Sequence, residues 1–468
     1  MSPNPDSQIL TVAQMRAAEE ALISAGSSVE ALMDLAGRGA ADWVWRIAAH
    51  RPVTVLCGPG NNGGDGYVIA EALRERGGQV AVVAATEPRT DAARNARSLY
   101  RGEVLGPEAR PKGEVLVDCL FGSGLTRALS AEHWQLLDEL AQRHAQRIAI
   151  DVPSGVDSDR GLPLNDGLPD YDLTLALGAW KPAHFLMPAS AAMGELRLVG
   201  IGAANVPGAP QVLTAPRLSR PAAGAHKYTR GLLAVVAGDM PGATLLACEA
   251  AQRSGAGYVK LLTERAPGFV PASLVVDSGR LSDAVADDRI AALLIGPGLG
   301  RGAEARERLL VALNSDIPAV IDADALHIAW PKAVDERTAP LIATPHEGEL
   351  VALERAFGLK GQGSKLERAR ALAAASGMVI VAKGPDTVIA APDGRLACAP
   401  RASSWLSVAG TGDVLAGVIA SRLAGGVDGF AAACQGVWLH AEAAHHCRGP
   451  FTAGDLATTV SVIYTENL

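Results

Sequence analysis

Short apolar runs alternate with amphipathic segments along most of the chain. The apolar runs have the length of buried strands, and the segments between them carry the three-to-four-residue apolar spacing of helices. In the first half, strands are predicted at Val53–Cys57, Val80–Ala84, Val115–Asp118, Ile148–Asp151 and Leu173–Leu177, with two helices over 11–49, broken at Ser27–Ser28, and others at Tyr67–Arg76, Asp91–Tyr100 and His133–Gln146. This alternation predicts a parallel sheet with helices on its faces, an α/β/α architecture.

The pattern stops between about 203 and 225, where four prolines occur without an apolar period. It resumes with strands predicted at Leu232–Ala237, Tyr258–Leu262, Ala292–Ile295, Ala319–Asp322, Leu341–Thr344 and Met378–Ala382. A chain of 468 residues is also too long for one ordinary core. We therefore expect two tandem α/β domains, at 1–210 and 226–468, joined by a linker at 211–225.

Composition narrows the class of protein. The net charge of −8 and an aromatic content of 4% give no basic or base-stacking surface for nucleic acid. The six cysteines are scattered without a CxxC pair, which fits a reducing compartment. The N-terminus lacks the pattern of a signal peptide, and no uncharged apolar stretch reaches membrane-spanning length. We expect a cytoplasmic homo-oligomer that acts on small molecules and binds neither nucleic acid nor membrane.

A glycine-rich segment, Gly58–Gly66, follows the first predicted strand. Its GxGxxG spacing alone is a weak dinucleotide signal, and a glycine-rich turn is the alternative. Asn61, Asn62 and Asp65 stand among these glycines, just before a predicted helix, where free backbone amides favour an anion. The carboxylate would oppose phosphate there unless it serves chemistry, a cation or a hydroxyl.

Two further strand ends carry polar groups. Asp118 precedes a loop, 122–128, whose amides, hydroxyls and guanidinium suit phosphate, and Asp151 ends the next strand. A lone aspartate at a strand end is usually a cap or turn residue. Because the carboxyl ends of parallel strands share one sheet edge, three such aspartates together predict a ligand site.

These segments resemble the NAD(P)H-hydrate epimerase domain over residues 9–200. The motifs are LTVAQMRAAEE, ALMDLAG, GPGNNGGDGYVIA, DCLFGSGLTR and DVPSGVD. The resemblance implies a Rossmann-like sandwich that binds hydrated NADH or NADPH through Asn61, Asn62, Gly63, Gly64, Asp65, Gly122, Ser123, Gly124, Leu125, Thr126, Arg127, Ala128 and Asp151. It also implies a potassium ion held by Asn62, Asp118 and Ser154, and Asp151 as the carboxylate that moves the proton.

In the second half, Gly410-Thr411-Gly412-Asp413 leads directly into the helical run VLAGVIASRLA. Glycine amides at a helix N-terminus form an anion hole, although a glycine turn with an acidic first-turn residue is an equal alternative. GPGLG, DADAL, TPHEGE and KGPDT follow other predicted strands, and no GxxxxGK[ST] motif of a Walker-type NTPase occurs.

Together with MPGATLLACEAAQRSGAGYVKL, these motifs resemble the ADP/ATP-dependent NAD(P)H-hydrate dehydratase branch of the ribokinase-like superfamily, over residues 226–468. The resemblance implies nucleotide contacts from Lys383, Gly384, Pro385, Asp386, Thr387 and Gly412, and coenzyme contacts from Ala243, Gly298, His346 and Asp413. It implies Asp413 as the catalytic base, Mg²⁺ with the nucleotide, and ADP, or else ATP, as the phosphoryl donor. Ser403-Ser404-Trp405-Leu406-Ser407 departs from the small-residue NxGM-like stretch common in bacterial members.

Two alternatives of other classes remain at this point. One is a ribokinase-like small-molecule kinase whose N-terminal domain is a non-catalytic scaffold, and the other is a nicotinamide-nucleotide sensor without turnover. A histidine-rich segment, His440–Cys447, lacks the four-residue spacing of a helical metal site, and Ala431–His446 is interpreted as a core helix.

Overall fold

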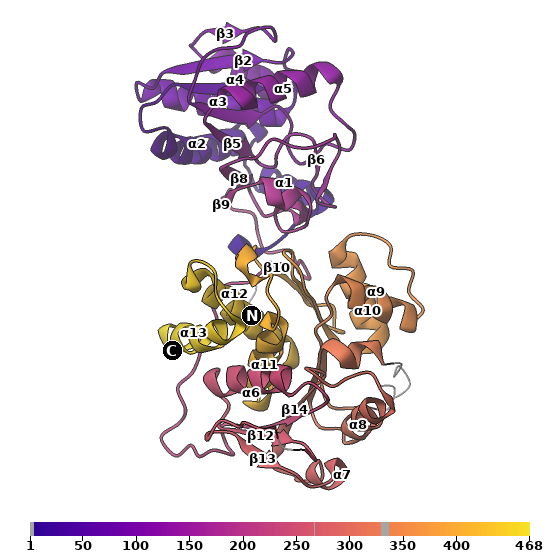
Figure 1. Cartoon of the computed structure of the whole chain (residues 1–468). Coiled ribbons are helices and arrows are strands. Elements are labelled where there is room, and N and C mark those ends of the chain that lie inside the picture. Colours follow the sequence, from indigo (N-terminus) through magenta and orange to yellow (C-terminus); the bar gives the residue numbers. More distant parts are fainter. Residues whose placement is uncertain (1–3, 266, 329–336) are drawn as a thin grey trace. The chain divides into compact units, whose positions relative to one another are not determined.

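The computed structural model describes residues 4–265, 267–328 and 337–468. The chain divides into two compact units, Ser2–Gln211 and Val212–Leu468, each with its own sheet (Figure 1). Residues 211–225, predicted as a linker, thus group almost entirely with the second unit and carry strand β10 (Gln211–Val212). Within the described residues, none of the helices is long and apolar enough to cross a membrane.

The first unit is built on a seven-stranded sheet in the order β3-β2-β1-β4-β5-β8-β9, and all its strand pairs are parallel. The strands are β1 (Val53–Cys57), β2 (Val80–Ala84), β3 (Val104–Leu105), β4 (Val115–Cys119), β5 (Gln146–Ile150), β8 (Leu173–Leu177) and β9 (Glu195–Val199), and a separate hairpin joins β6 (Val156–Asp157) to β7 (Leu162–Pro163). The bounds of β1, β2, β4, β5 and β8 agree with the five predicted strands to within two residues, whereas β3, β6, β7 and β9 were not predicted.

Helices cover both faces of this sheet. They are α1 (Val12–Ser24), α2 (Val29–Ala48), α3 (Asn61–Glu75), α4 (Asp91–Leu99) and α5 (Ala131–Arg143). Alternate residues of β1 enter different cores: Val55 packs with α2, α3 and α4, whereas Leu56 packs with α5. This two-sided burial explains why the strands are continuously apolar and easy to find in the sequence.

Helix α3 begins at Asn61, six residues before the predicted start at Tyr67. Glycine has low helix propensity, so the segment was expected to be a loop. The glycines are required instead for close packing: a Cβ on Gly63 would lie 1.9 Å from the carbonyl oxygen of Gly58. Asn61, Asn62 and Asp65 therefore project from the first turns of a helix rather than from a loop.

The second unit contains a ten-stranded sheet in the order β10-β19-β18-β17-β16-β15-β14-β11-β12-β13. Its strands after β10 are β11 (Leu232–Val236), β12 (Tyr258–Leu262), β13 (Val275–Asp277), β14 (Ile290–Ile295), β15 (Ala319–Ile321), β16 (Leu341–Ala343), β17 (Val379–Ala382), β18 (Val388–Ala390) and β19 (Leu396–Cys398). The pairs from β13 to β17 are parallel, and β17-β18-β19 are antiparallel. The α/β/α prediction is confirmed, apart from this antiparallel edge.

Helices again lie on both faces of the second sheet (Figure 1). They are α6 (Pro241–Arg253), α7 (Leu281–Ala284), α8 (Ala303–Asn314), α9 (Glu347–Ala356), α10 (Lys365–Ser376), α11 (Thr411–Ala424), α12 (Gly429–Cys447) and α13 (Ala453–Glu466). Helices α6, α11 and α12 share one core with the sheet, and α13 packs behind them. The first turn of α11 thereby comes to the carboxyl ends of the central strands, where ligands of such sheets bind.

Two candidate active sites

The first unit has a cavity of about 500 Å³ at the carboxyl ends of β1, β4 and β5. Predicted residues that line it are Asn61, Asn62, Asp65, Gly122, Ser123, Gly124, Leu125, Thr126, Arg127 and Asp151. Gly63, Gly64 and Ala128, also predicted, are not among its lining residues. The lining also includes Arg16 and Glu19 from α1, which belong to the motif LTVAQMRAAEE but had no assigned role, and Lys181 after β8, which lies outside the motifs.

Asp151 is one of the residues that line this cavity. It follows β5 with a left-handed φ of 69°, a conformation that costs free energy for a residue with a Cβ. Its Oδ1 lies 2.5 Å from Lys181 Nζ, and its Oδ2 accepts a 2.8 Å hydrogen bond from the Ser123 amide. Burial acts to raise the pKa of Asp151, but the Lys181 cation and the hydrogen bonds outweigh it, so the pKa lies below its ordinary value.

Asp65 faces the same cavity from α3 and is only 8% exposed. Burial and then the neighbouring carboxylates of Asp151 and Glu19 raise its pKa well above the ordinary range, although Lys181 opposes the shift. The cavity therefore holds two carboxyl groups with opposite shifts: the pKa of Asp151 is lowered, which favours its ionised form, and that of Asp65 is raised, which favours its protonated form.

Beside the cavity, Asp118 is fully buried and accepts four hydrogen bonds. Ser154 donates to it through both its hydroxyl (2.7 Å) and its amide (3.0 Å), and the Tyr171 hydroxyl donates at 2.6 Å. Burial raises the pKa of Asp118, and these bonds only partly offset the rise. The described residues place no cationic side chain within ion-pair distance of this carboxylate.

Asn62 is the third residue expected to hold potassium. Its side-chain oxygen and nitrogen are buried and have no hydrogen-bond partner among the described residues. A Cβ on Gly122 would come within 3.2 Å of Asn62 Cγ and 3.0 Å of Asp151 Oδ2, which places these two residues side by side. An orphaned buried amide of this kind is rare and indicates a missing polar partner.

The second site lies at the N-terminus of α11. Gly410 caps this helix with a left-handed φ of 93°. The Thr411 hydroxyl donates to the carbonyl oxygens of Leu406 and Val408, which ties the preceding segment to the helix start. Burial, followed by the charge of Asp322, raises the pKa of Asp413 to about 7, while Lys383 opposes the shift. A carboxylate with this pKa is suited to act as a general base near neutral pH.

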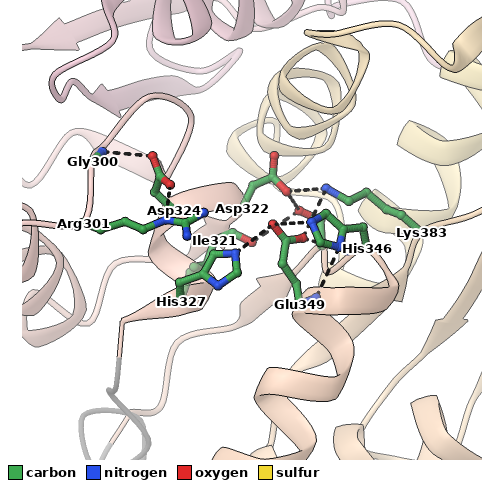
Figure 2. Close-up of polar contacts among 10 residues, drawn as sticks. Gly300, Arg301, Ile321, Asp322, Asp324, His327, His346, Glu349 and Lys383 are labelled. Atoms are coloured by element: carbon green, nitrogen blue, oxygen red, sulfur yellow. Dashed lines mark hydrogen bonds and ion pairs between the residues drawn. The ribbon is translucent and has the colours of Figure 1, made fainter.

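A polar cluster lies at neighbouring strand ends (Figure 2). Two of its members, Asp322 and Lys383, act on the pKa of Asp413. Asp322 Oδ1 accepts hydrogen bonds of 2.6 Å from both Lys383 Nζ and the Thr344 hydroxyl. Glu349 Oε2 lies 4.0 Å from Lys383 Nζ and accepts a 2.8 Å bond from the His346 amide at the start of α9. Asp322 and Glu349 belong to motifs noted in the sequence but had not been assigned to the site.

Ala243 and Gly298 are the other predicted coenzyme contacts. The two segments that contain them are held together by hydrogen bonds. The Met240 amide donates to the Gly298 carbonyl at 2.9 Å, and the Thr244 hydroxyl donates to Pro297 at 2.8 Å. A Cβ on Gly298 would lie 2.1 Å from the Met240 carbonyl oxygen, so glycine is required there.

A cavity of about 840 Å³ opens beside the α11 N-terminus. Predicted nucleotide contacts that line it are Lys383, Gly384, Pro385, Thr387 and Gly412. Asp386 does not line it and is half of a buried ion pair with Lys365, 2.6 Å apart. Trp405, Leu415 and Val437 make part of the wall apolar, as a nucleobase requires.

The histidine-rich segment lies on α12, as expected for a core helix. Buried His440 hydrogen-bonds to the Thr411 carbonyl at 2.9 Å, and burial lowers its pKa to about 4. Among the described residues, the group able to surround a metal ion is instead His327, His346 and Glu349. However, His346 Nδ1 accepts the Glu349 amide at 3.2 Å, which leaves its other ring nitrogen protonated and unsuited to a metal.

Comparisons with known proteins match both units. Residues 233–466 match the family described as NAD(P)H-hydrate dehydratase, and residues 29–183 match that described as YjeF-related protein N-terminus. The chain is 34% identical to a bifunctional NAD(P)H-hydrate repair enzyme of Thermosynechococcus vestitus, over 98% of this chain and 95% of that protein. This chain belongs to the bifunctional NAD(P)H-hydrate repair enzymes.

Another member of this repair-enzyme family, from Synechocystis, is 32% identical over 89% of this chain and 86% of its own length. Among solved structures, the chain is similar to the ADP/ATP-dependent NAD(P)H-hydrate dehydratase of Bacillus subtilis co-crystallised with ATP and Mg²⁺. The identity is 31%, the match covers 54% of this chain and 95% of that one, and the TM-score is 0.48. The repair-enzyme family thus spans both units and both candidate sites.

Proposed function

We propose that the first unit epimerises the R and S forms of hydrated NADH or NADPH, and that the second unit dehydrates the S form at the expense of ADP or ATP. The observation that carries the proposal is Asp413, a carboxylate with a pKa near 7 at the amide-rich start of α11, opposite the Lys383–Asp322 pair. A base and an anion-binding helix end are placed together, as phosphoryl transfer to a substrate hydroxyl requires.

In the second site, Asp413 accepts the proton of the coenzyme's ring hydroxyl as that oxygen attacks the terminal phosphoryl group. The amides of Thr411, Gly412 and Asp413 and the Lys383 ammonium stabilise the negative charge that spreads over the phosphoryl oxygens. The bond from the ring carbon to the ester oxygen then breaks, phosphate leaves with its electron pair, and the lone pair of the ring nitrogen stabilises the cation that forms. Loss of a neighbouring ring proton restores the dihydronicotinamide. Mg²⁺ bound to the nucleotide phosphates would supply further charge neutralisation, and the carboxylate of Asp322 is a suitable oxygen ligand for it.

In the first site, Asp151 handles the proton of the ring hydroxyl during inversion of the carbon that bears it. Arg127 and the amides of the 122–128 loop suit the coenzyme phosphates. A potassium ion held by Asn62, Asp118 and Ser154 fits two observations: the Asn62 amide oxygen is buried without a partner, and the Asp118 carboxylate is buried without a cation among the described residues. The ion would give the Asn62 amide oxygen a polar partner and would neutralise the charge of the Asp118 carboxylate.

One assay tests the whole proposal. An epimeric mixture of hydrated NADH is incubated with the protein and ADP or ATP, and both NADH and orthophosphate are measured. We expect NADH and orthophosphate to appear in equal amounts until both epimers are consumed. A stable phosphorylated coenzyme would indicate a kinase, and saturable binding without turnover would indicate a sensor.

A further inference from the structure

A buried lysine occupies the first site beside the predicted proton acceptor. Lys181 lies between β8 and a short 3-10 helix at Pro182–His184, and the whole residue is 1% exposed. It nevertheless lines the cavity that holds Asp151 and the 122–127 loop. Burial of a lysine is costly, so a position of this kind indicates a specific role for the ammonium group.

The hydrogen bonds of this ammonium group can be accounted for individually. An ammonium group has three hydrogens to donate and accepts none. Lys181 Nζ donates one to Asp151 Oδ1 and one to the Leu177 carbonyl oxygen, both at 2.5 Å. The third has no partner among the described residues, and Lys181 borders the cavity.

His184 holds Lys181 and Asp151 in position through two hydrogen bonds. Its Nδ1 accepts the backbone N–H of Lys181 at 2.9 Å, and its Nε2–H donates to the Asp151 carbonyl at 2.8 Å. Burial lowers the pKa of His184 to about 4, so the ring is neutral and acts as a brace between the two residues. The other charged groups that face Lys181 are Glu19 and Arg16 on α1 and Asp65 on α3.

We infer that Lys181 is a catalytic residue of the first site, the proton donor that works with Asp151 as proton acceptor. This inference rests on the epimerase function proposed above. Asp151 takes the proton of the ring hydroxyl, its oxygen–carbon bond becomes a carbonyl, and the bond from that carbon to the ring nitrogen breaks. The electron pair of this bond passes to the nitrogen, which receives the third Lys181 proton. Ring closure on the opposite face of the carbonyl returns both protons to their donors.

The charges of the pair suit this exchange. Lys181 and Asp151 sum to zero charge when one is an ammonium and the other a carboxylate, and they also sum to zero when both are neutral. The two proton transfers therefore create no net charge in a buried site, where an unpaired charge is costly. A carboxylate acting alone would gain a proton without an acid to neutralise the departing nitrogen.

Lys181→Arg provides the sharpest test because arginine keeps the positive charge beside Asp151 but does not release a proton near neutral pH. Lys181→Met removes the charge as well. Lys112→Met is the matched control, since Lys112 is an exposed lysine of the same unit. Each variant of the full chain is given ADP and purified R or S hydrated NADH, and recovery of NADH is followed. The S form requires only the second unit, and the R form must first be epimerised.

We expect both Lys181 variants to use the S form at the normal rate and the R form only at its spontaneous rate. This corresponds to a loss of roughly 10²–10⁴-fold in enzymatic epimerisation, with the KM for the R form changed little. Lys112→Met should behave as the unaltered chain does. Epimerisation by Lys181→Arg within a few-fold of the normal rate would overturn the inference.

Two controls separate the possible failures. If the unaltered protein itself consumes the R form only at the spontaneous rate, the proposed epimerase function fails rather than the role of Lys181. If Lys181→Met does not fold because Asp151 is left buried and unpaired, Lys181→Arg still decides the matter. The double variant with Asp151→Asn should then fold, because it removes both charges, and it should be no slower than either single variant, as expected for residues that act as a unit.

Discussion

Lys383 Nζ lies 2.6 Å from Asp322 Oδ1, and this ion pair joins the ends of two strands, β17 and β15, beneath the start of α11. A Cβ on Gly412 would lie 3.6 Å from the same Nζ, which brings the cation to the helix end where a phosphoryl group is expected. The pair also acts on the pKa of Asp413, the proposed base: burial and Asp322 raise this pKa, and Lys383 limits the rise to a value of about 7.

Dehydration should therefore depend on pH through Asp413. The carboxylate accepts a proton only when it is ionised, so kcat/KM for the S form should fall as the pH decreases through about 7 and level off above it. Epimerisation should not share this inflection, because the pKa of Asp151, its proposed proton acceptor, is lowered. The two rates can be measured between pH 5 and pH 9 on the same sample, and parallel profiles would contradict the assignment.

Asp413→Asn should reduce dehydration by roughly 10²–10⁴-fold, because it removes the proton acceptor while keeping the shape of the side chain. Binding of ADP should hold or improve, since a negative group beside the phosphates is lost. Calorimetric titration with ADP and single-turnover recovery of NADH measure the two effects. Asp283→Asn, at an exposed first-turn aspartate of α7 in the same unit, is the matched control and should change neither.

The same variant makes a prediction about stability. The pKa of Asp413 is higher in the folded chain, about 7, than its ordinary value of 3.8, so the folded state binds more protons between these values. Its contribution to the free energy of unfolding therefore declines as the pH rises across this window. Asp413→Asn should raise the melting temperature relative to the unaltered chain more at pH 8 than at pH 5. A difference in melting temperature that is independent of pH would indicate that Asp413 titrates normally.

The sequence predicted the sheets well and the sites in part. Buried parallel strands are nearly continuous apolar runs, so β1, β2, β8 and β12 were found at their observed bounds. The start of α3 was missed because its glycines serve tight packing, which local propensity does not reveal. The antiparallel strands β18 and β19 were not predicted, although the equally short parallel strands β15 and β16 were.

Lys181 was missed for a different reason. It lies 30 residues after Asp151, and a single lysine in a loop carries no motif. The parallel pairing of β5 with β8 brings the two together, because the ends of adjacent strands share one sheet edge. Asp386, in contrast, belongs to a recognised motif, yet the structure directs its carboxylate to Lys365 rather than to the cavity. A motif gives the segment that reaches a site but not the direction of each side chain.

Asp151→Asn should abolish epimerisation and leave dehydration of the S form unchanged. The amide cannot accept the hydroxyl proton, and losses of roughly 10²–10⁴-fold are typical for removal of such a group. Purified R and S hydrated NADH distinguish the two activities in one protein. Asp138→Asn, at a half-buried position on α5 that does not line the cavity, is a suitable control. If Asp151→Asn uses the R form at the normal rate, Asp151 is a structural turn residue and not the proton acceptor.

Trp405 offers a direct readout of nucleotide binding. Its side chain is 52% exposed on the wall of the larger cavity, within the segment that departs from the family pattern. Stacking of a base on an aromatic ring is worth about 1–3 kcal/mol, so Trp405→Ala should weaken ADP binding by roughly 5- to 150-fold. ADP should quench tryptophan fluorescence in the unaltered chain and in Trp438→Phe, a half-buried position on α12, but not in Trp405→Phe. Equal quenching in all three would exclude stacking on Trp405.

The two units should also work as separate fragments, and the structure specifies where the chain can be cut. A fragment of residues 222–468, which begins within the predicted linker, would lack two leucines that belong to the core of the second unit. Leu213 and Leu218 are 4% and 7% exposed, and their amides donate to the carbonyl oxygens of Cys398 and Asn467. Burying a leucine contributes about 1.5–3 kcal/mol, so a fragment of Val212–Leu468 should be clearly more stable than one of 222–468.

Urea unfolding of the two fragments measures this difference, and we expect a lower midpoint for the shorter one. The longer fragment should dehydrate the S form at the rate of the full chain and leave the R form to spontaneous epimerisation. Addition of the fragment 1–211 should restore use of the R form, because the first cavity is lined entirely by residues of that unit. Rapid use of both epimers by the C-terminal fragment alone would show that the first unit is not the epimerase. Equal stability of the two fragments would show that the leucine contacts contribute little.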